Sequence, residues 1–406
     1  MQWDSSVFLP YDSESRRKQR KWIESAFNDK AALQSYEPIR QRETYKLLHS
    51  LMNEPEGFAM HVKRFVAALL TEVTYGHTIK SLDDPYLLLM DRATRGTSEG
   101  GAAAALVDFF PVLRFIPSWM PGAGFKRHAL KVREIIHQAT SLPYHDVKDK
   151  VLAGTARTSL VASLLQEARR NGTLAQDERD IMAAASTING AGSDTTKSVL
   201  ASFVLAMVVY PEVLEKAQNE VDRVVGVDRL PQIEDRGKLP YIECIITEAL
   251  RWSSPVPLGI PHCLTEDDNY RGYIIPRGST VLGNIWAMTH DEETYSDPSI
   301  FRPERFLNMK AEVMETADPR AAVFGFGRRI CPGRYFADTN IFMAVTSIVA
   351  TLNIAKARDS TGKEIVPSIE FCSGLTRHPP EFVCSITPRS QRAMDMVSKM
   401  LMSLSD

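Results

Sequence analysis

Apolar residues recur every three or four positions along most of the chain, which is the spacing of amphipathic helices. The predicted helices cover residues 15–28, 34–53, 58–75, 126–139, 159–170, 177–209, 212–225, 240–251 and 333–350. No internal repeat and no long linker interrupts them. The pattern therefore predicts a mainly α fold in one domain that spans residues 1–406.

Strand signals are few and come late in the sequence. Residues 273–275 and 280–282 flank Pro276-Arg277-Gly278, which has the composition of a turn, so a hairpin is expected there. Residues 382–387 alternate between apolar and polar and predict another strand. Small β-sheets beside many helices complete the expected architecture.

Composition excludes several classes of protein. With 44% hydrophobic residues and a net charge of −2, the chain can form a large core and is not a nucleic-acid binder by bulk charge. Its five cysteines are scattered and odd in number, which argues against a disulfide framework or a zinc cluster. No run reaches the roughly 18 apolar residues that a bilayer span needs.

One cysteine lies in an unusual setting, the segment FGFGRRICPG at 324–333. Gly327 and Gly333 permit tight turns, and the segment leads into a predicted helix whose N-terminus favours negative charge. A single cysteine is more often a small buried apolar residue. Here the glycines and arginines around Cys331 favour a thiolate that is offered to a metal.

In the form F-x-x-G-x-R-x-C-x-G, this segment resembles the haem-ligand loop of the cytochrome P-450 monooxygenases. The matching residues are Phe324, Gly327, Arg329, Cys331 and Gly333. The resemblance implies that Cys331 is the axial ligand of a haem iron, where a thiolate favours O–O cleavage. It also implies that Arg329 pairs with a haem propionate, and that Phe324 and Gly327 belong to the haem-binding loop.

The predicted helix at 177–209 contains the segment AGSDTT at 191–196. Glycine costs about 1 kcal/mol in a helix interior and Ser, Asp and Thr prefer caps, so the segment either starts a second helix or marks a functional site. It resembles the oxygen-binding groove of the same family. The resemblance implies that Gly192 lets haem and dioxygen approach, that Asp194 relays protons, and that Thr195 helps to deliver the proton used in O–O cleavage.

Two further segments match the family outside these motifs. Glu248 and Arg251 are an i,i+3 pair, which is usually exposed and contributes about 0.2–0.5 kcal/mol. The resemblance instead implies a buried structural network of Glu248, Arg251 and Arg305. His262 resembles a strand residue that meets a propionate, although a surface histidine in a proline-rich turn is the alternative.

The basic run RRKQRK at 16–21 has three possible interpretations: a targeting or nucleic-acid patch, a solvated helix face, or the family's helix that contacts the haem propionates and the electron donor. The solvated face is favoured from the residues alone. The resemblance places Arg16 and Arg20 on the two propionate-contacting positions. Arg16 occupies the position of a usual tryptophan, which is missing unless Trp22 compensates.

Residues 106–125 are rich in Phe, Trp, Pro and Gly. They either pack in the core or form the family's loop that dips into a membrane surface at the substrate entrance. Residues 183–189, 256–260 and 373–376 are the candidate substrate contacts, and they indicate only an apolar substrate.

The resemblance implies a haem b enzyme that inserts one oxygen atom from O2 into an apolar organic substrate, with electrons from NADPH-cytochrome P-450 reductase. It further implies a fungal secondary-metabolic role, the cytoplasmic face of the endoplasmic reticulum, and a chain that lacks the family's anchor, first helices and leading strands. The alternative from another class is a truncated, non-catalytic haem-binding or partly folded fragment. A haem-thiolate isomerase or peroxide-using enzyme is disfavoured, because Asp194 and Thr195 suit the activation of dioxygen.

Overall fold

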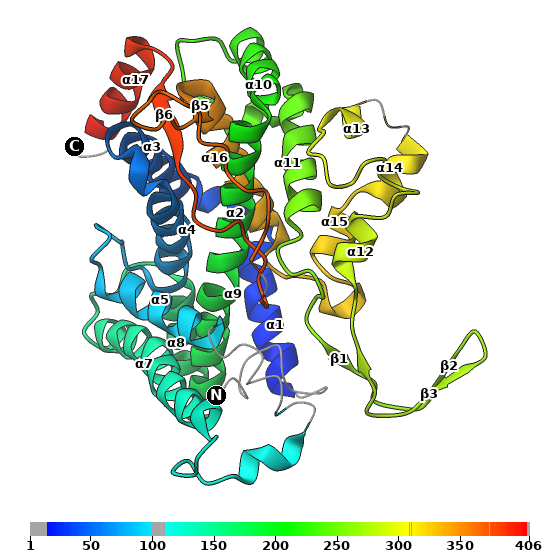
Figure 1. The fold of residues 1–406 in the computed structure, drawn as a ribbon. Helices are drawn as coiled ribbons and strands as arrows, with labels where there is room; N and C mark the ends of the chain where they lie inside the picture. The colour runs from blue at the N-terminus through cyan, green and yellow to red at the C-terminus, as the bar shows by residue number, and fades with distance from the viewer. Residues whose placement is uncertain are drawn as a thin grey trace. The chain divides into compact units, whose positions relative to one another are not determined.

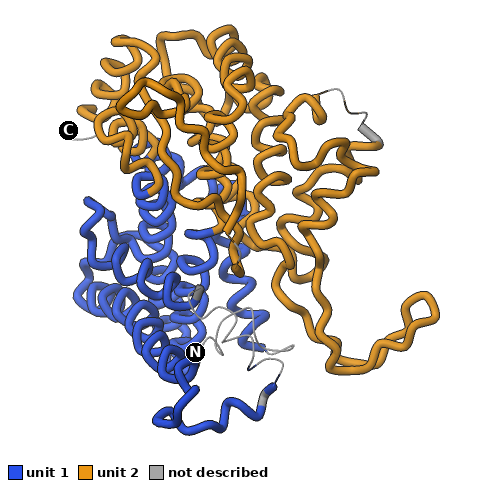
Figure 2. The backbone as a smooth tube through the Cα atoms, in the orientation of Figure 1, with its two compact units in different colours: residues 1–43, 60–194 blue, residues 44–59, 195–406 orange. Residues whose placement is uncertain are grey.

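The computed structural model describes residues 14–98, 107, 110–307, 309, 311–372 and 374–403. The chain divides into two compact units, one of residues 1–43 with 60–194 and one of residues 44–59 with 195–406 (Figure 2). The expected organisation as a single domain stays a prediction. Parts of two predicted segments, residues 106, 108–109 and 373, lie outside the described residues.

The regular elements among the described residues of the first unit are all helices. It contains α1 (Glu14–Phe27), α2 (Lys30–Ser35), α4 (Phe58–Tyr75) from residue 60, α5 (Pro85–Ser98), η2 (Pro111–Phe115), α7 (Gly124–Leu152), α8 (Leu160–Asn171), and the first parts of α3 (Glu37–Asn53) and α9 (Leu174–Val209). Helix α7 packs against both α5 and α8 (Figure 1). The core of this unit contains Tyr144, Val161, Leu165 and Ile181, so its helices are held by apolar burial.

The second unit is built around α16 (Arg334–Thr351), which is buried along most of its length. The other helices are the remaining parts of α3, α4 and α9, together with η1 (Pro55–Gly57), α10 (Pro211–Val224), η3 (Ile233–Lys238), α11 (Pro240–Ser253), α12 (Ile285–Thr289), α13 (Glu304–Leu307), α14 (Ala311–Ala317), α15 (Arg320–Val323), η4 (Gly327–Arg329) and α17 (Gln391–Met402). Helices α10 and α11 both pack on α16 (Figure 1). A helix that is apolar on all sides is expected at such a central position.

The described strands form three antiparallel pairs, all in the second unit. They are β1 (His262–Cys263) with β4 (Thr280–Val281), β2 (Asp268–Tyr270) with β3 (Tyr273–Ile275), and β5 (Leu352–Lys356) with β6 (Cys384–Pro388). The expected hairpin between 273–275 and 280–282 is wrong. Arg271 and Gly272 both have positive φ and reverse the chain from β2 into β3, which leaves β4 to pair with β1.

Helix boundaries differ from the expectation where a residue interrupts the pattern or the pattern is weak. Helix α7 continues through Pro143 to Leu152, beyond its predicted end at 139, although a proline usually breaks a helix. The helix expected at 34–53 is divided between α2 and α3, and the apolar pattern does not predict α5 and α17. The mainly α class with small sheets is confirmed.

Length and hydropathy limit which helices could cross a membrane. Within the described part of the chain, no single helix is both long and apolar enough to cross a bilayer. Helices α9 and α10 are long and apolar enough only when they are taken together, and the chain bends by 106° between them.

Candidate active site

The segment that carries Cys331 forms a closed loop between α15 and α16. The amide of Cys331 donates to the carbonyl oxygen of Phe324 at 2.7 Å, and Ile330 N–H donates to Gly327 O at 3.2 Å. Gly325 and Gly327 have φ values of 76° and 52°, a region that favours glycine. The turn predicted at Gly327 is therefore present, whereas Gly333 has a φ of −93°, which other residues also adopt. The loop places Cys331 shortly before Arg334, the first residue of α16.

The cofactor-binding residues predicted in this loop lie together. Phe324, Arg329 and Cys331 are half-buried, and Gly327 is exposed. Arg334, the first residue of α16, donates from Nη1 to the Cys331 carbonyl oxygen at 3.2 Å. The N-terminus of α16 and these arginines create a positive environment that stabilises negative charge on sulfur.

Three of the other four cysteines are less suited to bind a metal as thiolates. Burial raises the pKa of Cys244 to about 11, and burial raises the pKa of Cys384 to about 12. Cys263 is exposed on β1, outside any comparable loop. Since a metal ligand must be deprotonated, the donor chemistry favours Cys331, and the residues of its loop fit a haem iron.

Asp194 and Thr195 lie within one unbroken helix. Helix α9 runs continuously from Leu174 to Val209, so the alternative in which AGSDTT starts a second helix is wrong. Both side chains are half-buried. A Cβ atom on Gly192 would lie 2.9 Å from Leu70 Cδ1, so the missing side chain is required by the packing of α9 on α4. Its predicted role in admitting haem and dioxygen stays a prediction.

The predicted network of Glu248, Arg251 and Arg305 is confirmed. Arg251 Nε donates to Glu248 Oε2 at 2.7 Å, and Arg305 Nε donates to Glu248 Oε1 at 3.1 Å. Arg251 also donates from Nη1 to Thr289 O at 2.9 Å. Glu248 and Arg251 are fully buried, which excludes the alternative that they form a weak, exposed i,i+3 pair.

The remaining predicted haem contacts lie on separate elements. His262 is exposed on β1, opposite Val281 of β4, which agrees with the predicted strand position. Arg16 and Arg20 lie one turn apart on α1, in the first unit, and Arg20 pairs with Glu24 at 2.7 Å. The propionate contacts of all three stay predictions.

Trp22 does not share the exposure of the basic run around it. It packs against the core of the first unit, and Lys18 Nζ lies 5.4 Å from its ring centroid. Lys18 also pairs with Asp177 of α9. The basic run is therefore only partly a solvated face, because one of its cations holds α1 to the start of α9.

Arg377 is a structural residue that no sequence motif indicates. Its Nη1 donates to the carbonyl oxygens of Trp252 at 2.8 Å and Ser253 at 3.0 Å, at the C-terminus of α11. Its own carbonyl oxygen accepts from Ser198 of α9. Cations stabilise helix C-termini, but Arg377 is 124 residues from Ser253, so no local pattern could indicate the contact.

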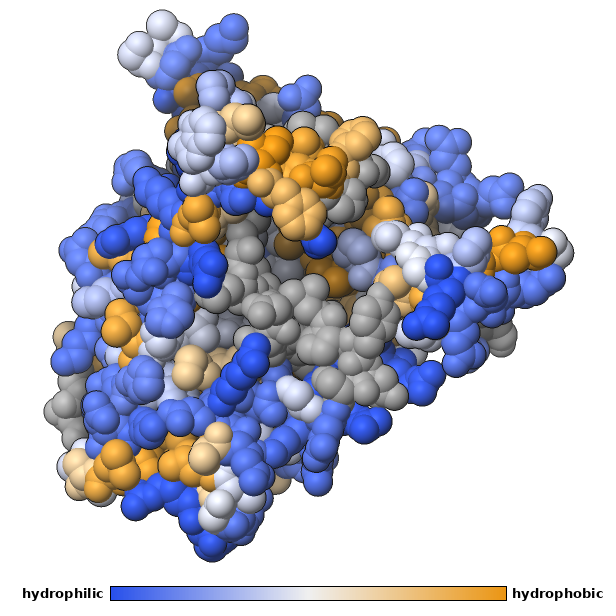
Figure 3. All heavy atoms as spheres, turned by 90° about the horizontal axis from the view of Figure 1, so that it is seen from below, coloured by the Kyte–Doolittle hydropathy of each residue, from blue (hydrophilic) through white to orange (hydrophobic). Residues whose placement is uncertain are grey.

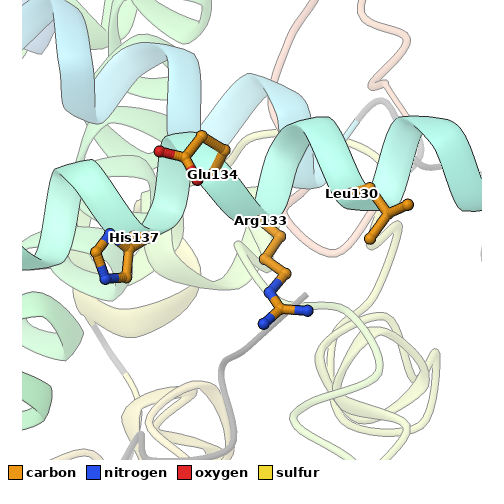
Figure 4. Close-up of a pocket in the computed structure, with 4 residues that line it drawn as sticks. All are labelled: Leu130, Arg133, Glu134 and His137. Carbon is orange, nitrogen blue, oxygen red and sulfur yellow. The ribbon is translucent and has the colours of Figure 1, made fainter.

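Surface features do not add residues to the candidate site. A hollow of about 510 Å³ is lined by Leu130, Arg133, Glu134 and His137, all from α7 (Figure 4). None of the predicted site residues lines it.

Apolar surface lies in separate patches among the charged residues (Figure 3). Phe115 is 70% exposed and Trp119 is 77% exposed, so the core-packing alternative for 106–125 is wrong at these positions.

Comparison with known proteins agrees with this loop and fold. A family model described as Cytochrome P450 matches residues 2–385. Cytochrome P450 monooxygenase 176 of Postia placenta is 44% identical over 393 residues, which cover 96% of this chain and 75% of that protein. Cytochrome P450 monooxygenase claR of Ampulloclitocybe clavipes is 40% identical over 400 residues, which cover 97% of this chain and 73% of that protein.

Solved structures support the same fold. A zebra fish cytochrome P450 with progesterone superposes with a TM-score of 0.77 at 23% identity, over 95% of this chain and 85% of that one. The chain belongs to the cytochrome P450 family. It is a haem-thiolate monooxygenase whose cofactor is haem b bound through a cysteine thiolate, and it uses O2, a substrate and a redox partner. A non-catalytic fragment is not favoured by these relatives.

Proposed function

We propose that Cys331 is the cysteine that binds the haem iron, and that the protein inserts one oxygen atom from O2 into an apolar organic substrate. The observation that supports this most is the closed loop with the Cys331 N–H donating to Phe324 O at 2.7 Å. That bond fixes the backbone at the sulfur-bearing residue. A fixed thiolate with nearby positive charge needs little reorganisation to bind a metal.

When bound, haem supplies the activation of dioxygen. The protein residues hold the haem and move protons. Arg329 and His262, with Arg16 and Arg20, would bind the propionates as cationic or hydrogen-bonding groups. Asp194 would take a proton from solvent and pass it to Thr195, whose hydroxyl would hold it where dioxygen is activated.

The electron donor we propose is NADPH-cytochrome P-450 reductase, and the biological setting is fungal secondary metabolism. The support is the fungal origin of the relatives, including claR of Ampulloclitocybe clavipes. The substrate is apolar, because residues 183–189 and 256–260 are mainly apolar.

We further propose that the protein works at the cytoplasmic face of the endoplasmic reticulum and touches the membrane weakly through residues 115–120. The exposure of Phe115 and Trp119 supports this contact. Binding to phospholipid vesicles should weaken in Trp119→Ser, and unchanged binding would contradict the contact.

The activity is tested by reconstituting purified holoprotein with the reductase and a panel of apolar compounds. A substrate should shift the haem spectrum, accelerate NADPH consumption and give a product that carries one atom from ¹⁸O2. NADPH consumption without labelled product from any compound that shifts the spectrum would contradict the proposal.

A further inference from the structure

Four charged side chains in the second unit form a closed ring. Arg236 belongs to η3, Glu243 to α11, Arg320 to α15 and Asp338 to α16. The charges alternate around the ring, and each arginine contacts both carboxylates. The ring therefore joins η3 and α11 to α15 and α16, and its members Glu243 and Arg320 are 77 residues apart in the sequence.

The distances around the ring are those of ion pairs and charge-assisted hydrogen bonds. Arg236 lies 2.6 Å from Glu243 and 2.5 Å from Asp338, and Arg320 lies 3.1 Å from Asp338 and 3.4 Å from Glu243. The four side chains are only 17–29% exposed. Charges that form a network contribute more than isolated surface pairs.

The ring contacts the chain on both sides of the predicted haem ligand. Arg320 comes four residues before Phe324, and Asp338 comes seven residues after Cys331. Glu243 lies on α11, five residues before Glu248 of the buried network. Arg320 is also fixed to α11 by a 2.7 Å hydrogen bond from Nη1 to Thr247 Oγ1.

The loop is less buried than α16, which follows it. Every residue from 324 to 333 is half-buried or exposed, whereas α16 is buried along most of its length. The hydrogen bonds within the loop close it on itself. Where the closed loop lies therefore depends also on how its two ends are held.

We propose that this charge ring is a positioning device for Cys331. By fixing one end of the loop to α11 through Arg320 and the other end to η3 through Asp338, the ring keeps the bond from Cys331 N–H to Phe324 O formed and the sulfur correctly oriented. The inference rests on the proposed role of Cys331 and assigns positioning roles to Arg236, Glu243, Arg320 and Asp338.

The test compares Asp338→Asn and Arg320→Gln with the control Glu364→Gln, which affects an exposed pair with Arg358 in the same unit. Hydrogen exchange of the holoprotein is followed by mass spectrometry in peptides that cover 324–333. Each ring variant should exchange there about tenfold faster, equivalent to about 1.4 kcal/mol. Transfer of haem to apomyoglobin should accelerate similarly, and the control should match the wild type.

A charge swap separates the ring from a single ion pair. In Arg320→Asp with Asp338→Arg, an isolated pair would be restored, whereas the ring would place like charges against Glu243 and Arg236. We expect no rescue of exchange or haem retention. Full rescue by the swap, or single variants that behave like the wild type, would overturn the ring.

The wild-type protein provides a test that does not depend on the folding of variants. At 1 M NaCl the screening length falls to about 3 Å, so exchange should accelerate in 324–333 relative to peptides from buried α16. The proposal would be overturned if exchange in 324–333 did not accelerate, or if it accelerated equally in 324–333 and in α16. If the wild type shows no thiolate spectrum, the proposed role of Cys331 is wrong. The hydrogen-exchange comparison would still test whether the charge ring holds the 324–333 loop in place.

Discussion

Glu248 accepts a hydrogen bond from Arg251 at 2.7 Å, and both side chains are 0% exposed. Arg305 adds an ion pair to the same carboxylate at 3.1 Å, and the backbone N–H of Arg302 donates to it at 2.7 Å. A carboxylate so deeply buried is tolerated only while its partners remain. The pair therefore fixes α11 to the segment that contains α13.

Removal of the Arg251 side chain should destabilise the protein strongly. Arg251→Ala leaves Glu248 buried with fewer cationic partners, and the expected loss is about 3–5 kcal/mol of unfolding free energy. Urea unfolding followed by circular dichroism measures it. Arg302→Ala is the matched control, because it removes an exposed pair with Asp297 worth about 0–1 kcal/mol. Equal losses in the two variants would contradict the structural role of the network.

Substitution of the polar residues of α9 should separate oxygen consumption from product formation. Thr195→Ala should still consume NADPH and O2, but release more hydrogen peroxide and less product, because the final proton donor is missing. Asp194→Asn should slow turnover, and general acid–base groups typically contribute 10²–10⁴-fold. Peroxide, product and NADPH are measured in the same reaction.

Ser202→Ala is the control for these variants, since Ser202 lies on the same helix and donates to the Ser198 carbonyl oxygen at 2.8 Å. It should keep the wild-type ratio of product to NADPH. Wild-type ratios and rates in both the Thr195 and Asp194 variants would exclude their proposed proton delivery.

His290 should make the protein less stable in mild acid. Burial, with the positive charges of Arg251 and Arg377, lowers the pKa of His290 to about 4. The unfolded state has a pKa near 6.5 and therefore binds more protons between pH 6.5 and 4. Stability should fall as the pH drops through this window, with no contribution from His290 above it.

His290→Phe tests this expectation, because it keeps a ring that can stack on Trp286, whose centroid lies 4.8 Å away. The variant should lose less unfolding free energy than the wild type between pH 6.5 and 4. Parallel pH profiles for the two proteins would mean that His290 does not cause the loss.

The features that sequence can predict are those encoded locally. The apolar period predicts α4 at 58–75 with the same boundaries as the structure, and the fixed spacing around Cys331 indicates its loop. The AGSDTT segment is ambiguous by propensity, because its residues suit a cap as well as a functional helix interior. The continuous helix from Leu174 to Val209 decides that question.

The features that sequence cannot predict depend on distant partners or on ambiguous turns. Arg377 reaches the end of α11 across more than a hundred residues, and Glu243 and Arg320 of the charge ring are 77 residues apart. The pairing of β2 with β3 depends on the turn at Arg271-Gly272, whereas the proline-containing turn that follows has the stronger sequence signal. Propensity alone does not choose between two adjacent turns.

The measurement that tests the central claim most directly is the absorption spectrum of the reduced protein with carbon monoxide. The wild type should show the red-shifted Soret band of a thiolate-bound haem, and Cys331→Ser should lose it. Cys244→Ser and Cys372→Ser should keep it, because those cysteines lie outside the 324–333 loop. Retention of the red-shifted band in Cys331→Ser, or its loss in either control, would contradict the assignment of Cys331 as the haem ligand.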